Sequence, residues 1–143
     1  MDPALLWGHA MTHDDFTREP LEQLVEEFVA LVIEADNLFM VAPIRQRNRI
    51  LDRYRAIGDE ILLRGEAGAN AMIILMNHED AAVRGAAAAR CLLRNVYRDR
   101  AIDVLADICD LRAGNVSMSA ADALMIAGEF DMKTGPIRRP TKA

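Results

Sequence analysis

The sequence contains few of the residues that build disulfide frameworks, metal sites or membrane spans. Its only cysteines, Cys91 and Cys109, lie in apolar-periodic segments, where a free thiol usually behaves as a small buried hydrophobe. The longest apolar runs, such as 28–33, fall far below the ~18 residues of a membrane helix. The start MDPALLWGHAM carries an acid and no base before its short apolar run, which is unlike an export signal. We therefore expect a cytoplasmic protein with no membrane partner.

Positive charge is also scarce, and the net charge of −5 argues against nucleic acid as a partner. The charge is unevenly distributed: residues 1–36 hold nine acids and one base, whereas residues 37–100 hold seven acids and eleven bases. Fifteen of the seventeen bases are arginine, whose planar fork pairs bidentately with carboxylate or phosphate. The favoured interpretation is that the acidic first helix and the basic second helix pair with each other or are solvated.

Apolar residues recur at helical spacing along the chain, without a convincing period-two alternation, and this pattern predicts an all-α fold. A first helix begins at Pro20, and a second follows a break at 37–43 and ends near Gly65, a good helix stop. Four shorter helices are expected at 67–76, after the connection 77–80, at 98–112 and at 116–128.

The last four expected helices contain a weak internal sequence repeat. Residues 71–75 resemble residues 101–105 at an offset of 30, and the pattern of the alanine-rich fourth helix returns in the sixth at an offset of 33. Two related helical hairpins are implied. Such units stack so that each covers the apolar face of the next.

Arg84 is an unusual residue in the alanine-rich segment HEDAAVRGAAAARCL. At 100° per residue it shares one stripe with Ala87, Ala88 and Cys91, which places it on the packed side of its helix. An inward guanidinium needs an acidic or carbonyl partner. Asp80, one turn earlier, and the carboxylates of adjacent connections are the obvious candidates.

The segment from Asp80 to Arg84, with the alanines after it, resembles the start of the second helix of a HEAT-like repeat. This resemblance implies that Asp80 and Arg84 form a structural pair between repeats. Three longer runs, LEQLVEEFVALVIEAD, DEILLRGEAGANAMIILMNHEDAAVRGAAAARCLL and AADALMIAGEFDMKTG, resemble small bacterial proteins classed as domain of unknown function twenty-nineteen, over about residues 20–135. The second hairpin departs from the pattern at Val116 and Ser117, as a terminal capping unit would. The resemblance implies a fold and no site.

These observations predict an all-α protein of about six helices, in which a long antiparallel pair precedes two HEAT-like hairpins as a short α-solenoid. An irregular N-terminal tail is expected at 1–17, a single domain at 18–130 and a flexible C-terminal tail at 131–143.

Histidines are too few to predict a metal site, and no cofactor is expected. His9 and His13 have metal-compatible spacing, but they lie in the segment least expected to be helical. His78 and Glu79 resemble one of the His-Glu pairs of HEAT-like iron hydroxylases, whose sites need several converging pairs. A loop and helix-start role is favoured for them. A metal or enzyme-like site around His78 stays the alternative.

The function favoured by the sequence is a non-enzymatic protein-interaction module or adaptor, of the inhibitor or immunity type, that binds another bacterial protein. The candidate partner-binding residues, which would also serve a weak nucleic-acid binder, are Arg45, Arg49, Arg53, Arg90 and Arg94. Val25, Val29 and Ile33 widen the apolar arc of the first helix beyond what one neighbour needs. Either the tail residues 5–7 or a second copy in a homodimer covers them.

Overall fold

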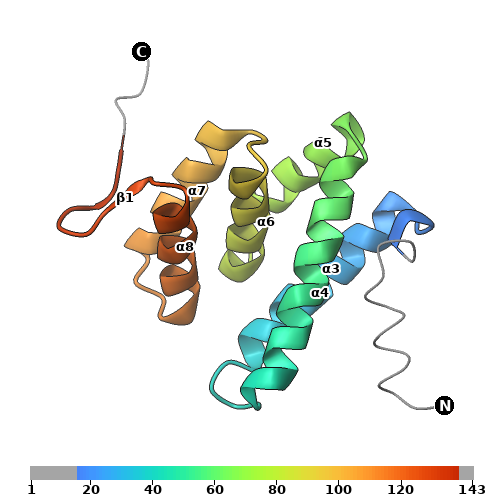
Figure 1. Ribbon diagram of the computed structural model, residues 1–143, viewed down its shortest axis with the longest axis horizontal. Helices are drawn as coiled ribbons and strands as arrows, with labels where there is room; N and C mark the ends of the chain where they lie inside the picture. The colour runs from blue at the N-terminus through green and yellow to red at the C-terminus, as the bar shows by residue number, and fades with distance from the viewer. Residues whose placement is uncertain (1–15, 139–143) are drawn as a thin grey trace. The chain divides into compact units, whose positions relative to one another are not determined.

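The computed structural model describes residues 16–138, and six complete helices lie within them. They are α3 (Leu21–Asn37), α4 (Ile44–Leu63), α5 (Glu66–Leu75), α6 (Ala81–Leu93), α7 (Arg98–Asp110) and α8 (Asn115–Ile126), followed by a hairpin of β1 (Phe130–Asp131) and β2 (Gly135–Pro136) (Figure 1). The predicted all-α fold is confirmed. None of the described helices combines the length and the apolar character that crossing a bilayer requires. The solenoid stacking of the hairpins stays a prediction.

The chain divides into two compact units, with the boundary between Met72 and Ile73 inside α5. The single domain expected over 18–130 stays a prediction. Residues 1–15 of the expected N-terminal tail lie outside the described residues, whereas Phe16 is helical and buried.

In the first unit, α3 and α4 form the antiparallel pair that the sequence predicts (Figure 1). The apolar stripes meet between the helices, and the ring of Phe28 contacts that of Tyr54 edge-on, with 5.7 Å between ring centroids. The buried side chains of α3 and α4 recur every three or four residues: Leu24, Phe28, Leu31, Val32, Ala35, Ile50, Ile57 and Ile61. Burial of these two stripes is therefore what joins the pair.

Arg64, at the C-terminal end of α4, fastens the segment before α3 to this unit. Its Nη2 donates to the carbonyl oxygens of Phe16 at 2.9 Å and of Glu19 at 2.8 Å, and its Nε donates to the carboxylate of Glu60 at 3.2 Å. Glu60 is buried, so this partner offsets the cost of taking a carboxylate out of water. The chain then turns at Gly65, whose φ of 70° ends α4 where the sequence predicts.

In the second unit, α6, α7 and α8 pack on one another. The small side chains of Ala87, Ala88 and Cys91 have no exposed surface, which confirms the predicted packed face of α6. Asp80 begins this helix as its N-cap, accepting hydrogen bonds from the backbone N–H of Ala82 and of Val83. Small residues allow the close helix approach that this arrangement needs.

Residues 131–138 of the predicted C-terminal tail include a short hairpin, while residues 139–143 lie outside the described part. The flexibility expected for 131–143 stays a prediction. The strands β1 and β2 pair antiparallel. Glu129 just before β1 is buried, and the Nη2 of Arg98 donates to its carboxylate at 3.0 Å. The backbone N–H of Ile137 donates to the Glu129 carbonyl oxygen at 3.0 Å. An ion pair between the buried Glu129 and the half-buried Arg98 at the start of α7 thus holds this segment in place.

Gly68 is required where α5 passes the end of α4. A Cβ at this position would lie 1.7 Å from the backbone oxygen of Ile61, whereas a Cβ at Gly85 would meet only the Cδ1 of Ile108, at 3.3 Å. We expect Gly68→Ala to lower the free energy of unfolding by about 3 kcal/mol, because backbone must move to relieve the overlap. Gly85→Ala should stay within about 1 kcal/mol, since a side-chain end can shift and alanine favours the helix. Urea unfolding of both variants checks this; equal effects would contradict it.

Arg64→Met should cost about 2–4 kcal/mol, because it removes one partner of a buried carboxylate and the donor to several backbone carbonyl oxygens. Arg55→Met is the matched control, since Arg55 is an exposed arginine of the same helix with no interaction among the described residues. It should change stability by less than about 0.5 kcal/mol. Urea unfolding measures both changes. A loss for Arg64→Met no larger than that of the control would show that the hydrogen bonds of Arg64 contribute nothing to stability.

Candidate functional site

The connection between α3 and α4 exposes a concentration of large apolar side chains. Met40 is 86% exposed, Val41 80%, Ile44 75% and Phe39 36%, all within six consecutive positions. We call residues 38–44 the apolar loop. Connections normally carry polar residues, and single exposed apolar residues mean little, but a contiguous group of this kind is a candidate interaction site.

The apolar loop has a defined conformation. The backbone N–H of Val41 and that of Ala42 both donate to the carbonyl oxygen of Leu38, at 3.1 and 3.0 Å. Met40 takes a left-handed conformation with φ of 64°. Arg47 supports the loop from α4, because its Nε donates to the Ala35 carbonyl oxygen at 3.1 Å and its guanidinium lies 5.0 Å from the centre of the Phe39 ring. The exposed side chains are therefore presented by an ordered turn.

Positive charge borders the apolar loop on its α4 side. Arg45 and Arg49 are exposed, and no hydrogen bond or ion pair within residues 16–138 engages either of them. No acidic residue occurs between positions 37 and 51, and the nearest preceding acids are Glu34 and Asp36 in the last turns of α3. The loop with Arg45 and Arg49 forms one apolar surface with a basic border.

The other three predicted partner-binding arginines differ from Arg45 and Arg49, because each of them interacts within the chain. Arg53 is half-buried, forms an ion pair with Glu27, and places its guanidinium 5.5 Å from the centre of the Phe16 ring. The ion pair between Arg53 and Glu27 agrees with the interpretation that the acidic first helix and the basic second helix pair with each other. Arg90 and Arg94 belong to the second unit and interact within the chain.

The predicted self-association strip on α3 is less accessible than the apolar loop. Val25, Val29 and Ile33 are all half-buried. The tail residues 5–7, the alternative cover for this strip, lie outside the described residues. A homodimer through this strip stays a prediction.

The predicted pair of Asp80 and Arg84 is corrected by the structure. Arg84 is half-buried, and its Nη1 donates to the carbonyl oxygens of His78 at 2.9 Å and of Glu79 at 3.0 Å. The Asp80 carboxylate caps α6 instead. Arg84 therefore ties down the connection that precedes its own helix, rather than a carboxylate of a neighbouring repeat.

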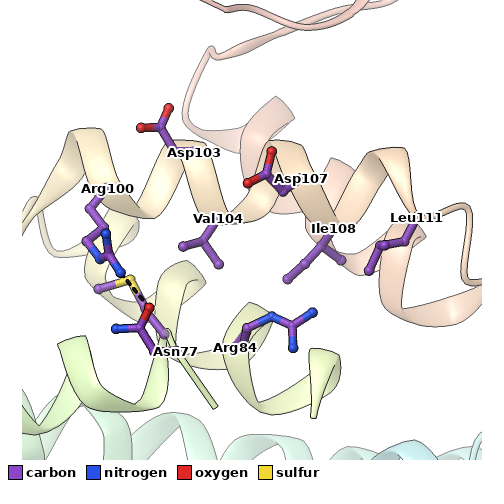
Figure 2. A pocket seen from close by; sticks show the side chains of 9 residues that line it. Asn77, Arg84, Arg100, Asp103, Val104, Asp107, Ile108 and Leu111 are labelled. Carbon is purple, nitrogen blue, oxygen red and sulfur yellow. Dashed lines mark hydrogen bonds between the residues drawn. The ribbon is translucent and has the colours of Figure 1, made fainter. Parts of the chain in front are cut away.

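A hollow of about 270 Å³ lies next to Arg84 in the second unit (Figure 2). One wall comes from the end of α5 and the start of α6, with Met76, Asn77 and Arg84, and the other from the exposed side of α7. Arg100 donates to the side-chain oxygen of Asn77 at 2.6 Å and so links the two walls at one end. The α7 side of the lining consists of Arg100, Asp103, Val104, Asp107, Ile108 and Leu111.

His78 takes part in the backbone structure of its connection, since its Nδ1 accepts a hydrogen bond from the Asp80 N–H at 3.0 Å. Within the described part of the chain, no three His, Cys, Asp or Glu side chains gather in a way that could hold a metal ion. His9 and His13 lie outside it.

The thiols of Cys91 and Cys109 differ in exposure to solvent, since Cys91 is buried and Cys109 is half-buried. Burial raises the pKa of Cys91 to about 11. Burial also raises the pKa of the half-buried Cys109, with a further rise from the Asp110 carboxylate that Arg138 partly offsets. Both cysteines therefore carry protonated thiols at neutral pH and are poor nucleophiles there.

Sequence reasoning identified the break at 37–43 but missed the apolar loop, although the signal was present. The letters LFMVAP lie where neither amphipathic stripe continues, so they have no helix face to bury them. The hollow had no signal of this kind, because its walls come from helices whose alignment the sequence does not specify.

No protein-family model, curated protein or solved structure matches the chain. Its function is therefore inferred from the geometry and chemistry of its own surfaces.

A thiol reagent tests the environments of the two cysteines. At pH 8 we expect Cys109 alone to react in the native protein, with Cys91 at least roughly a hundredfold slower because it needs local opening. The Cys109 rate should keep rising as pH passes 9, since the thiolate is the reactive form and the pKa is raised. The Cys109→Ala variant is the control and should show no rapid reaction. Fast labelling of Cys91 would contradict its buried position.

Proposed function

We propose that this protein is a non-enzymatic interaction module that binds another protein through the apolar loop and the bordering Arg45 and Arg49. The observation that carries the proposal is the exposure of Met40, Val41 and Ile44, each at least three-quarters open to solvent. Burying an apolar side chain of this size contributes about 1.5–3 kcal/mol. A partner that covers all three gains a substantial part of a specific binding energy.

The ordered conformation of the loop supports the same conclusion. Association is costly when a segment must be immobilised. Here the hydrogen bonds to the Leu38 carbonyl oxygen and the contact between Arg47 and Phe39 already hold the loop. Most of the conformational entropy that a flexible loop would lose on binding is therefore already lost in the free protein.

The charges around the loop indicate the chemistry of the partner. Arg45 and Arg49 favour a protein surface in which carboxylates border an apolar recess. Arginine suits this role because its fork pairs bidentately with a carboxylate. The finer assignment, an adaptor or an inhibitor of a bacterial protein, rests on the resemblance to HEAT-like repeats and belongs to the same proposal.

The double variant Met40→Ser/Val41→Ser tests the proposal. Both side chains are exposed, so the fold should be kept while the apolar surface is lost. The matched control is Ile126→Ser/Met132→Ser, which removes two similarly exposed apolar side chains from the second unit. The partner is isolated with the parent chain, purified, and its dissociation constant measured with each variant by isothermal titration calorimetry.

We expect the loop variant to weaken binding by at least about tenfold, and the control to remain within about twofold. Arg45→Gln/Arg49→Gln should reduce the association rate and its dependence on salt. Equal losses from the loop and control variants would overturn the proposal. So would a concentration-dependent size of the chain alone that the loop variant abolishes, because a second copy would then be the occupant.

A further inference from the structure

We infer that the hollow in the second unit binds a carboxylate that carries a short apolar chain. The group can be a free aliphatic acid or the C-terminal residue of a polypeptide, since both offer this chemistry. The inference does not depend on the proposed function, because it concerns another unit and other residues.

The carboxylate would be held by Arg84. A guanidinium has five N–H donors, and Arg84 directs only Nη1 at the carbonyl oxygens of His78 and Glu79. No described residue accepts a hydrogen bond from its Nε or Nη2. These two atoms form the fork that pairs bidentately with a carboxylate. The two carbonyl bonds hold the guanidinium in place, so the fork is positioned in advance.

The apolar chain would lie on α7. In Figure 2, Val104 and Ile108 point from α7 toward the Arg84 side, and the guanidinium of Arg84 points toward Ile108 and Leu111. Val104 and Leu111 supply the accessible apolar surface next to the charged fork, since Met76 and Ile108 are almost fully buried. A volume of about 270 Å³ suits a chain of a few carbons. A small inorganic anion would leave this apolar surface uncovered.

Two aspartates on the rim oppose an anion, and their placement limits this effect. In Figure 2 the carboxylate of Asp103 lies on the side of α7 that faces away from Arg84, although both aspartates belong to the lining of the hollow. Asp107 also lies 3.6 Å from Arg138, which partly neutralises it. Arg100 adds a positive charge at the opposite end of the hollow. The lining therefore combines two arginines, two aspartates, an asparagine and apolar side chains.

Titration of the full chain with small probes, followed by NMR, tests the inference. We expect hexanoate to bind with a dissociation constant on the order of a millimolar and to shift the signals of the Arg84 Nε–H and the Val104 methyls. Hexanamide lacks the charge and acetate lacks the chain, so each should bind about tenfold more weakly. A peptide that ends in leucine, compared with its C-terminal amide, shows whether a chain end is accepted besides the free acid.

Variants separate binding from folding. Arg84→Lys keeps a donor for the connection but loses the fork, and hexanoate affinity should fall about fivefold. Asp103→Asn removes an exposed rim charge and should strengthen hexanoate binding about twofold at low salt. Asp122→Asn, at an exposed position of α8 that does not line the hollow, is the control and should change nothing.

The inference is overturned if hexanoate and hexanamide bind equally, if inorganic phosphate binds more tightly than hexanoate, or if none of the probes shifts the Arg84 and Val104 signals. It is also overturned if Asp103→Asn and Asp122→Asn have the same effect on hexanoate affinity. Binding of the peptide with a free carboxylate but not of its amide would extend the inference to chain ends.

Discussion

Arginine side chains that donate to backbone carbonyl oxygens hold the connections of this protein. The last carbonyls of every helix lack partners within the helix, and a chain of short helices has many such ends. A guanidinium brings several donors to one place and accepts nothing, so one arginine can donate to as many as three carbonyl oxygens. Within residues 16–138, four arginines donate in this way: Arg47 to Ala35, Arg64 to Phe16, Thr17 and Glu19, Arg84 to His78 and Glu79, and Arg98 to Ala127.

This use of arginine also decides which charges remain for recognition. Arg47 supports the apolar loop, whereas Arg45 and Arg49, two positions away on either side, stay in solvent beside it. Arg84 uses one nitrogen for its connection and keeps its fork toward the hollow. The basic stretch 37–100 is therefore less available to a partner than its eleven bases suggest. Both candidate surfaces lie where a structural arginine meets exposed apolar side chains.

Most of the helical architecture could be predicted because each helix carries a local signal. The stripe from Leu24 to Val32 and the alanines of α6 are buried as their spacing requires, and Gly65 ends α4. The candidate surfaces could be predicted less well than the helices. Arg45 and Arg49 were placed correctly at the surface, but Arg53 was also expected there, and its pairing with Glu27 depends on how α3 and α4 align. The ordered segment 131–138 depends on Arg98, 31 positions before Glu129.

The sequence by itself determined the helices, their inward faces and the need of Arg84 for a partner, because periodicity, helix stops and the cost of burying charge act over a few residues. Only the tertiary structure decided that this partner is a pair of carbonyl oxygens, because every residue carries a carbonyl and the sequence does not mark which ones lack a donor. It likewise decided that Met40, Val41 and Ile44 stay exposed and that α7 leaves a hollow beside Arg84, since burial depends on which surfaces long-range packing brings together.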